Sequence, residues 1–491
     1  MELPASFTEY TRTLLGNEGY MQLVTSLESE QPVSIRLNPL KPFAFRSGKD
    51  ALPWCTSGFY LKERLTFTFD PLFHAGCYYV QEASSMFVER ALKQYMGEEP
   101  VVMLDLCAAP GGKSTHARSV LPEDSLLVAN EVIRNRSQIL AENLTKWGYP
   151  DVVVTNSDPS DFTPLADFFD IILADVPCSG EGMFRKDPVA VSEWSPENVE
   201  ICWQRQRRII SDIWPCLKPG GILIYSTCTC NTKENEENIR WIRDEFGAEV
   251  LSLDVSEDWN ITGNLLQGED FPVYRFLPHK TKGEGFFLAV LRKQGGNACK
   301  SGGEPEFVQG YTPGIQGLNG ENSRKKGKNP HGKGMKTLGL SGEQLSALKK
   351  WVLAPEKYEF IQKGSNVSAF PKRYLAELSV LQASLRVVQA GVELAEEKGK
   401  DWMPCHALAM SRILASDAFP REELSYEKAI AYLRKEAVVL SDASPRGAVL
   451  LTYRHVPLGF VKNIGNRANN LYPQEWRIRS GYLPEVISTV I

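Results

Sequence analysis

The sequence predicts an α/β protein whose central part carries a Rossmann-like, mostly parallel sheet. Short apolar runs alternate with helix-like stretches between about residues 96 and 295, the pattern of strands joined by crossover helices. Four of the runs end in polar residues, and open α/β sheets hold their ligands at the carboxyl ends of their strands. At 491 residues the chain is too long for one core, so two or three domains are expected.

Five strands are expected in this central part, each a short apolar run next to a turn or a polar residue. A helix is expected from Ser114, directly after the glycine turn that follows the first strand. A turn at Gly220-Gly221 is expected to open the last strand. The strands are expected at residues 101–106, 126–129, 152–155, 171–174 and 222–225.

Composition restricts the class of protein. A hydrophobic fraction of 43% and a charged fraction of 23% are those of a globular protein. No apolar run approaches the roughly 18 residues of a membrane span, and the N-terminus has no signal-peptide pattern, so a cytoplasmic protein without a membrane partner is expected. Ten cysteines in this length are too few for a disulfide scaffold. A net charge of −5 leaves room for a local basic face.

Residues 1–95 are expected to form an N-terminal RNA-binding extension, and they contain two unusual stretches, 34–41 and 73–85. The first places Arg36 and Lys41 around a proline that ends a strand. These side chains could touch phosphate, although the composition of both stretches favours structural connectors.

Three further segments follow the central part. Residues 296–339 are rich in glycine and lysine and are expected to form a flexible basic linker. This linker is either a simple tether or a segment that follows a phosphate backbone. A helical subdomain is expected at 340–424 and a small β-unit at 425–491. Residues 446–479 contain six Arg or Lys residues and only one acidic residue, which suggests contact with RNA.

The first chemical motif is 104–114, Leu-Asp-Leu-Cys-Ala-Ala-Pro-Gly-Gly-Lys-Ser. A strand, a glycine turn and a helix follow one another, so backbone N–H groups can face a ligand. A phosphate-binding Walker loop would need glycine where Cys107 stands. A dinucleotide fingerprint fails as well, which leaves a nucleoside-type ligand. Glu131, 19 residues after Gly112, lies where an acid accepts hydrogen bonds from ribose, and Asp158 is a second candidate.

Two further motifs carry thiols. The fourth strand is followed by Asp175-Val-Pro-Cys178-Ser-Gly, and the fifth by Ser-Thr-Cys228-Thr-Cys230. A zinc site would need Cys-x-x-Cys spacing or nearby histidines, and a disulfide does not suit a reducing compartment. Inert burial remains the alternative for either cysteine. The position after the strand favours Cys228 as a nucleophile.

These motifs resemble the Fmu/Sun (NSUN) family of RNA cytosine-5 methyltransferases, and most closely its RsmF-type members, which modify 16S ribosomal RNA. The resemblance extends to both ends of the catalytic part, at 76–85 and 275–287. At the C-terminus, 469–478 is similar to the PUA-like unit of these proteins. The resembling motifs are residues 104–114, 129–148, 173–182 and 223–238.

The resemblance implies a Rossmann-like methyltransferase that acts on 16S ribosomal RNA or the small ribosomal subunit, as a monomer and without a metal. It implies Cys228 as the nucleophile, Cys178 as the thiol that assists product release, and Asp175 at the base. Cys230 lies outside the family pattern, so which thiol attacks is left open. S-adenosylmethionine would be bound by Cys107, Ala108, Ala109, Pro110, Gly111, Gly112, Lys113, Glu131, Asp158 and Asp175.

Two other functions fit parts of the sequence. A DNA cytosine-5 methyltransferase would share the sheet, but there the cysteine of the Pro-Cys motif attacks. A non-catalytic ribosome-assembly factor could retain the fold. The second thiol at Cys228 and the PUA-like tail favour RNA, and the intact cysteine pair and cofactor loop favour an enzyme.

Overall fold

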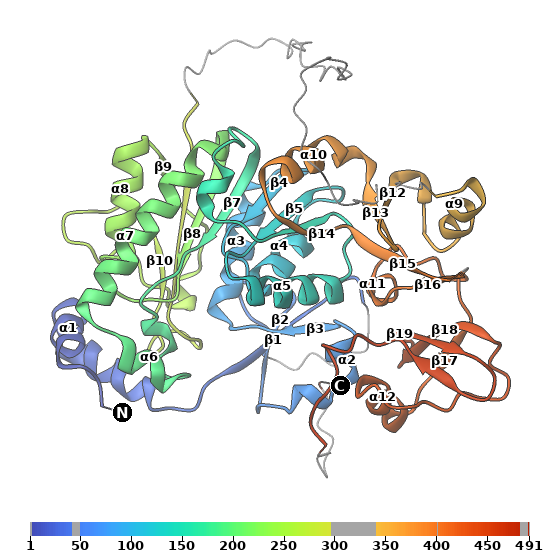
Figure 1. The fold of residues 1–491 in the computed structure, drawn as a ribbon. Helices are drawn as coiled ribbons and strands as arrows, with labels where there is room; N and C mark the ends of the chain where they lie inside the picture. Colours follow the sequence, from blue (N-terminus) through green and yellow to red (C-terminus); the bar gives the residue numbers. More distant parts are fainter. Residues whose placement is uncertain (1, 42–49, 296–339, 400, 482–489, 491) are drawn as a thin grey trace, which may run out of the picture.

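A computed structural model describes residues 2–41, 50–295, 340–399, 401–481 and 490 (Figure 1). The predicted linker at 296–339 lies outside the described residues. These residues form four sheets, of which the largest is the nine-stranded sheet of the central part. None of the helices described is long and apolar enough to cross a membrane.

The large sheet has the strand order β10-β11-β8-β7-β4-β5-β6-β14, with β9 paired to β11. Its five central strands are parallel, and the outer ones are antiparallel. The chain runs outward from β4 through β5 and β6, then returns to place β7 and β8 on the other side of β4. The strands are β4 (Val102–Asp105), β5 (Leu126–Asn130), β6 (Val152–Thr155), β7 (Phe169–Asp175), β8 (Leu217–Thr227), β9 (Glu249–Leu251), β10 (Tyr274–Phe276), β11 (Phe286–Arg292) and β14 (Val387–Ala390).

Helices cover both faces of this sheet, as its continuous apolar strands require. Leu92, Ala117 and Leu140 represent the core on the face of α3, α4 and α5. Ile210, Ile239 and Leu381 represent the core on the opposite face. The helices are α3 (Val88–Tyr95), α4 (Gly112–Val120) and α5 (Arg134–Trp147) on the first face, and α7 (Pro196–Ile213), α8 (Glu236–Phe246) and α10 (Leu375–Ser384) on the second.

The predicted Rossmann-like α/β fold is confirmed, and each of the five expected strands is present. One detail differs. The Gly220-Gly221 pair does not open β8 but lies within it, where the ladder to β7 is irregular between Phe169 and Ile171. Gly220 has a φ of +78°, so the chain bends there and returns to the sheet at Ile222.

The N-terminal part consists of a long helix and a three-stranded antiparallel sheet of order β2-β1-β3. Arg36 is fully buried, and its guanidinium donates to Gln81, Thr115 and the Gly112 carbonyl. Lys41 donates to the carbonyls of Ala75 and Lys146. Both are therefore connectors, and the alternative of phosphate contact is wrong for them. The elements are α1 (Ala5–Leu27), β1 (Val33–Leu37), β2 (Gly58–Leu61), α2 (Pro71–His74) and β3 (Tyr78–Val80).

The expectation of a helical subdomain at 340–424 is wrong. These residues form a four-stranded sheet of order β12-β13-β15-β16 with short helices around it. The hairpin turns at Gly364, with a φ of +62°, and cross-strand pairing overrides the local helical pattern. The elements are α9 (Gly342–Lys349), β12 (Tyr358–Lys363), β13 (Asn366–Pro371), β15 (Val392–Lys398), β16 (Asp401–Pro404) and α11 (His406–Met410).

β14 joins this region to the large sheet. It pairs with the edge strand β6, and the Arg386 carbonyl accepts from the Asn156 amide at 2.9 Å. The C-terminal region thus closes the open edge of the parallel strands.

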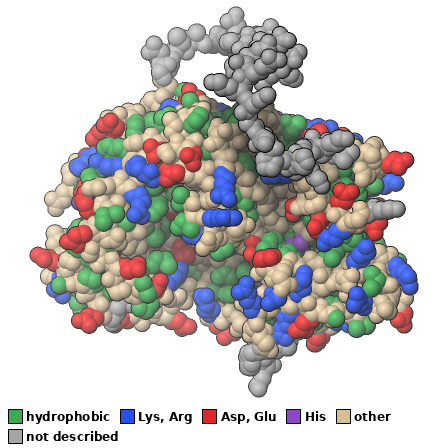
Figure 2. Space-filling model, in the orientation of Figure 1, with side chains coloured by type: hydrophobic (Ala, Val, Ile, Leu, Met, Phe, Trp, Pro, Cys, Tyr) green, Lys and Arg blue, Asp and Glu red, His purple; other side chains and the backbone are tan. Residues whose placement is uncertain are grey.

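The last unit is a four-stranded sheet that shares a core with the N-terminal sheet. Ile35 and Tyr78 pack in one cluster with Ile430 and Val461. Figure 2 shows Lys and Arg side chains gathered over this unit, beside a hollow in the surface. The elements are β17 (Arg421–Glu423), α12 (Tyr426–Leu433), β18 (Gly447–Tyr453), β19 (Val456–Asn463) and β20 (Ala468–Asn470).

We predict that Gly148→Ala destabilises the protein more than Gly247→Ala. Both glycines end a helix with positive φ, so each alanine costs about 1–2 kcal/mol in backbone strain. A Cβ on Gly148 would lie 2.4 Å from the Met410 carbonyl oxygen, whereas one on Gly247 meets no described atom within 4 Å. The overpacking should cost about 1–3 kcal/mol more. Thermal unfolding measures both, and equal losses would contradict the packing argument.

Candidate functional site

A cavity of about 300 Å³ lies at the carboxyl ends of β4, β7 and β8. β4 and β7 are the neighbours between which the strand order reverses, the place where open α/β sheets bind ligands. The cavity wall includes Lys113 at the start of α4, Asp175 at the end of β7 and Cys228 directly after β8. The N-terminal part adds Tyr79 and Gln81. The cavity therefore brings all three sequence motifs together.

The loop after β4 is anchored from outside. Asn143 donates to the Pro110 carbonyl at 2.7 Å and Arg136 to the Ala109 carbonyl at 2.8 Å. Gly111 caps α4 with a φ of +114°, a conformation that favours glycine. Of the predicted cofactor residues in this loop, all but Gly111 line the cavity, namely Cys107, Ala108, Ala109, Pro110, Gly112 and Lys113.

A lysine–carboxylate pair lies on the cavity wall. Lys113 Nζ is 2.8 Å from Asp175 Oδ2, and Ser226 Oγ donates to Asp175 Oδ1 at 2.7 Å. Burial acts to lower the pKa of Lys113, but the Asp175 carboxylate and other nearby groups outweigh it and raise the pKa. Lys113 is therefore a fixed cation beside a fixed hydrogen-bond acceptor.

Asp105, the last residue of β4, is a buried carboxylate in the cavity that the sequence analysis did not select. Ser114 Oγ donates to its Oδ2 at 2.6 Å. Its Oδ1 is buried without a hydrogen-bond partner among the described residues. Burial raises the pKa of Asp105 to about 7. The free oxygen is suited to a cationic group of a ligand.

Two thiols meet at the mouths of β7 and β8. Cys178 Sγ and Cys228 Sγ are 3.1 Å apart, and the Cys228 amide donates to Cys178 Sγ at 3.3 Å. The hydrogen bond with Cys228 and then burial raise the pKa of Cys178 well above its usual value. Cys178 therefore keeps its proton and can donate it to the Cys228 sulfur.

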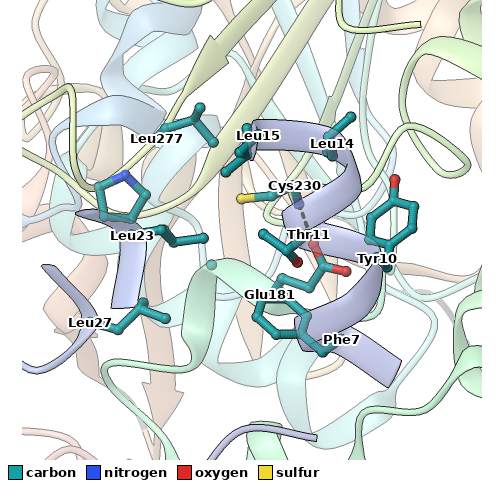
Figure 3. A pocket seen from close by; sticks show the side chains of 12 residues that line it. Phe7, Tyr10, Thr11, Leu14, Leu15, Leu23, Leu27, Glu181, Cys230 and Leu277 are labelled. Atoms are coloured by element: carbon teal, nitrogen blue, oxygen red, sulfur yellow. Dashed lines mark hydrogen bonds between the residues drawn. The ribbon is translucent and has the colours of Figure 1, made fainter. Parts of the chain in front are cut away.

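Cys230 occupies different surroundings. It lines a separate space of only about 10 Å³ beneath α1, together with Phe7 and Leu277 (Figure 3). Burial raises its pKa to about 12. Of Cys228 and Cys230, it is Cys228 that lines the large cavity.

Glu131 and Asp158 do not line the cavity. The Glu131 carboxylate accepts from the Ile133 amide at 2.8 Å and lies 3.5 Å from Arg136, which holds the cofactor loop. Asp158 caps a short helical turn and lies 3.2 Å from Arg208. Their predicted contacts with a cofactor stay predictions.

A buried cluster of possible metal ligands lies behind the loop. The ligand atoms of Cys55, Glu89 and His116 are within 4.8 Å of one another. Glu89 already accepts from Thr56 and His116 and pairs with Lys93. Burial raises the pKa of Cys55 to about 12. The cluster is a hydrogen-bond network that joins α3 to α4.

Comparison with known proteins identifies the family. The model of the 16S rRNA methyltransferase RsmB/F family matches residues 92–292, the RsmF N-terminal domain matches 3–83, and the RsmF PUA domain matches 419–478. The ribosomal RNA small subunit methyltransferase F of Citrobacter koseri is 33% identical over 88% of this chain and 85% of its own length. The chain belongs to the RsmF family.

Other relatives agree. The Serratia proteamaculans methyltransferase F is 30% identical over 98% of both chains. A methyltransferase homologue from Pyrococcus horikoshii is 30% identical, with a TM-score of 0.50 over 59% of this chain and 94% of that one. As an RsmF-family methyltransferase, the protein uses S-adenosylmethionine as its methyl donor.

We predict that Asp105→Asn stabilises the ligand-free RsmF-family protein at alkaline pH. The folded carboxyl keeps its proton up to a pKa of about 7, whereas its ordinary pKa is 3.8. The folded state thus binds more protons between these values, and stability falls as pH rises through this range. A pKa difference of about three corresponds to about 4 kcal/mol.

Denaturant unfolding at pH 5 and pH 8 measures this effect. The gain from Asp105→Asn should be large at pH 8 and shrink toward pH 4. Asp258→Asn, at an exposed acid, is the control and should show no such trend. An equal effect of Asp105→Asn at both pH values would contradict the assignment.

Proposed function

We propose that the protein methylates carbon 5 of cytosine in 16S ribosomal RNA, in the cytoplasm, through a covalent adduct between Cys228 and carbon 6. The observation that carries the proposal is the pair of thiols 3.1 Å apart beside the Lys113–Asp175 pair. The names of the relatives support ribosomal RNA as the substrate.

The residues of the cavity fit S-adenosylmethionine, which supplies a methyl group on a positively charged sulfur. The free Oδ1 of Asp105 suits its ammonium group. The loop from Cys107 to Lys113 offers backbone groups at the start of α4, and Glu131 lies beside that loop for the ribose. Asp158 would have to release Arg208 to contribute.

Carbon 5 of cytosine is a poor nucleophile until a thiolate adds to carbon 6. The thiolate is the attacking form of a cysteine, so groups that stabilise a Cys228 thiolate favour the attack. The S–H of Cys178 supplies a hydrogen bond to it. Electrons pushed into the ring are stabilised at its polar edge, where Lys113 and Asp175 offer a donor and an acceptor. Positioned proton transfer contributes roughly 10²–10⁴-fold.

Product release requires an elimination. The proton on carbon 5 leaves to a base, the double bond between carbons 5 and 6 re-forms, and the electron pair of the carbon–sulfur bond returns to Cys228. Cys178 stabilises the departing thiolate from 3.1 Å. The same hydrogen bond therefore serves the first and the last step.

The target base has to reach a cavity in the protein, so it must be unpaired or flipped out of its stack. The C-terminal unit matches an RsmF PUA domain and presents basic side chains next to the catalytic part (Figure 2). We propose that this unit and, as expected from the sequence, residues 1–95 contact the RNA backbone. The exposed or half-buried basic residues are Arg446, Arg454, Lys462, Arg467, Arg477 and Arg479.

We predict that Cys228→Ala abolishes methyl transfer and that Cys178→Ala accumulates a covalent protein–RNA adduct. The first variant lacks the nucleophile, and the second lacks the group that assists its departure. Cys230→Ala is the control and should retain turnover. Tritium transfer from S-adenosylmethionine to RNA and denaturing gels measure both effects.

Full turnover by the Cys228 variant would disprove the assignment. An adduct that needs Cys178 instead of Cys228 would indicate the mechanism of DNA cytosine-5 methyltransferases, and equal transfer to DNA and RNA would do the same. Failure to bind S-adenosylmethionine in calorimetry would favour an assembly factor. Bisulfite mapping of ribosomal RNA from a deletion strain identifies the cytosine.

A further inference from the structure

Two buried glutamates join the loops that carry the two thiols. Glu181 lies in the loop after β7, three residues beyond Cys178, and Glu234 lies in the loop after β8, six residues beyond Cys228. They are 4% and 0% exposed. Neither is needed by the mechanism above, and the sequence analysis selected neither.

Each glutamate binds the backbone of the opposite loop. Glu234 Oε2 accepts from the Ser179 amide at 3.0 Å, directly next to Cys178. Glu181 Oε2 accepts from the Cys230 amide at 2.9 Å, a contact that is drawn in Figure 3. The Gly182 amide adds a direct bond to the Cys228 carbonyl at 2.8 Å.

Further donors fix the two carboxylates. Asn231 Nδ2 bridges them, at 3.2 Å from Glu181 and 2.8 Å from Glu234. Trp194 Nε1 donates to Glu181 at 3.0 Å, and Gln206 Nε2 to Glu234 at 2.7 Å. Among the described residues, these hydrogen-bond donors include no lysine or arginine.

The burial of two neighbouring carboxylates lowers the stability of the fold, which suggests that they serve a role. Burial raises the pKa of both glutamates, and two buried carboxylates that share one amide repel each other. An apolar pair would hold two loops together with less penalty. A carboxylate, however, accepts several hydrogen bonds in fixed directions, so it can set the spacing of two backbones more accurately.

We propose that Glu181 and Glu234 are positioning residues that form a reciprocal clasp between the two loops and set the distance between Cys178 and Cys228. The inference deepens the proposed function, because it rests on the roles given there to the two thiols. The clasp keeps Cys178 in hydrogen-bond contact with the nucleophile during attack and release.

The test uses a readout that needs no RNA. Diamide takes two electrons and two protons from neighbouring thiols and joins them in a disulfide, here between Cys178 and Cys228. Mass spectrometry follows the rate of this reaction in the full-length protein. Glu234→Gln should slow it about tenfold or more, because a displacement near 1 Å costs about 10²-fold in a positioned reaction. Glu237→Gln, on the adjacent helix, is the matched control and should react at the wild-type rate.

Activity on RNA supplies the second readout. Glu234→Gln and Glu181→Gln should lower kcat about 10²-fold with KM for RNA nearly unchanged, and should alter the fraction of covalent adduct. Glu234→Asp should not rescue, since its shorter side chain cannot reach both Ser179 and Gln206. Rescue by Asp would show that only charge matters and would overturn the clasp.

Thermal unfolding accompanies each variant. The Ser179 hydroxyl also donates to Glu234 Oε1. If Glu234→Gln fails to fold, Ser179→Ala removes this hydroxyl donor, keeps the Ser179 amide, and should slow disulfide formation to a smaller extent. Wild-type rates of disulfide formation in folded Glu181 and Glu234 variants would overturn the proposal. Slow disulfide formation in these variants, with a wild-type protein that does not methylate RNA, would overturn the proposed function and leave the clasp standing.

Discussion

The parallel register of β7 and β8 is the constraint on which the site depends. Asp175 lies opposite Ser226, and the Ser226 hydroxyl donates to the Asp175 carboxylate. From these paired positions one loop reaches Cys178 and the other reaches Cys228 within a few residues. A slip of one residue would turn the side chains of one strand to the other face of the sheet and separate the thiols. The strand pairing therefore sets where the two thiol-bearing loops begin relative to each other.

The site contains buried carboxylates that lower the stability of the fold, and other contacts compensate for this loss. Asp105 and the two clasp glutamates are buried carboxylates whose pKa values burial raises. Lys113 offsets the negative charge of Asp175. The rest of the fold compensates for such unfavourable burial at a functional site. Here the hydrogen bonds that anchor the loop after β4 and the packing of α1 over Cys230 contribute.

The catalytic sheet could be predicted because its strands are short apolar runs buried on both faces. Cys178 and Cys228 could be selected because they lie within three residues of the ends of such strands, and Lys113 because it belongs to the glycine-turn motif after the first strand. The sheet within residues 340–424 could not be predicted, because β12 and β13 exist only as a cross-strand pair, whereas the β-unit after residue 425 was expected. The role of Arg36 was ambiguous because residue type alone does not show whether an arginine is buried or free to bind phosphate. Its burial is visible only in the structure. Asp105 was within a selected motif, but its unpaired oxygen is visible only in three dimensions.

The pairing of β14 with β6 has a consequence for synthesis. The two strands are separated by 387 − 155 = 232 positions, so the edge of β6 stays unpaired until the ribosome has made that further length. At about 5–20 residues per second this takes roughly 10–50 s. An exposed strand edge is a template for association with other chains. Nascent chains are therefore most prone to aggregate in this interval, and a chaperone that covers strand edges would protect them then.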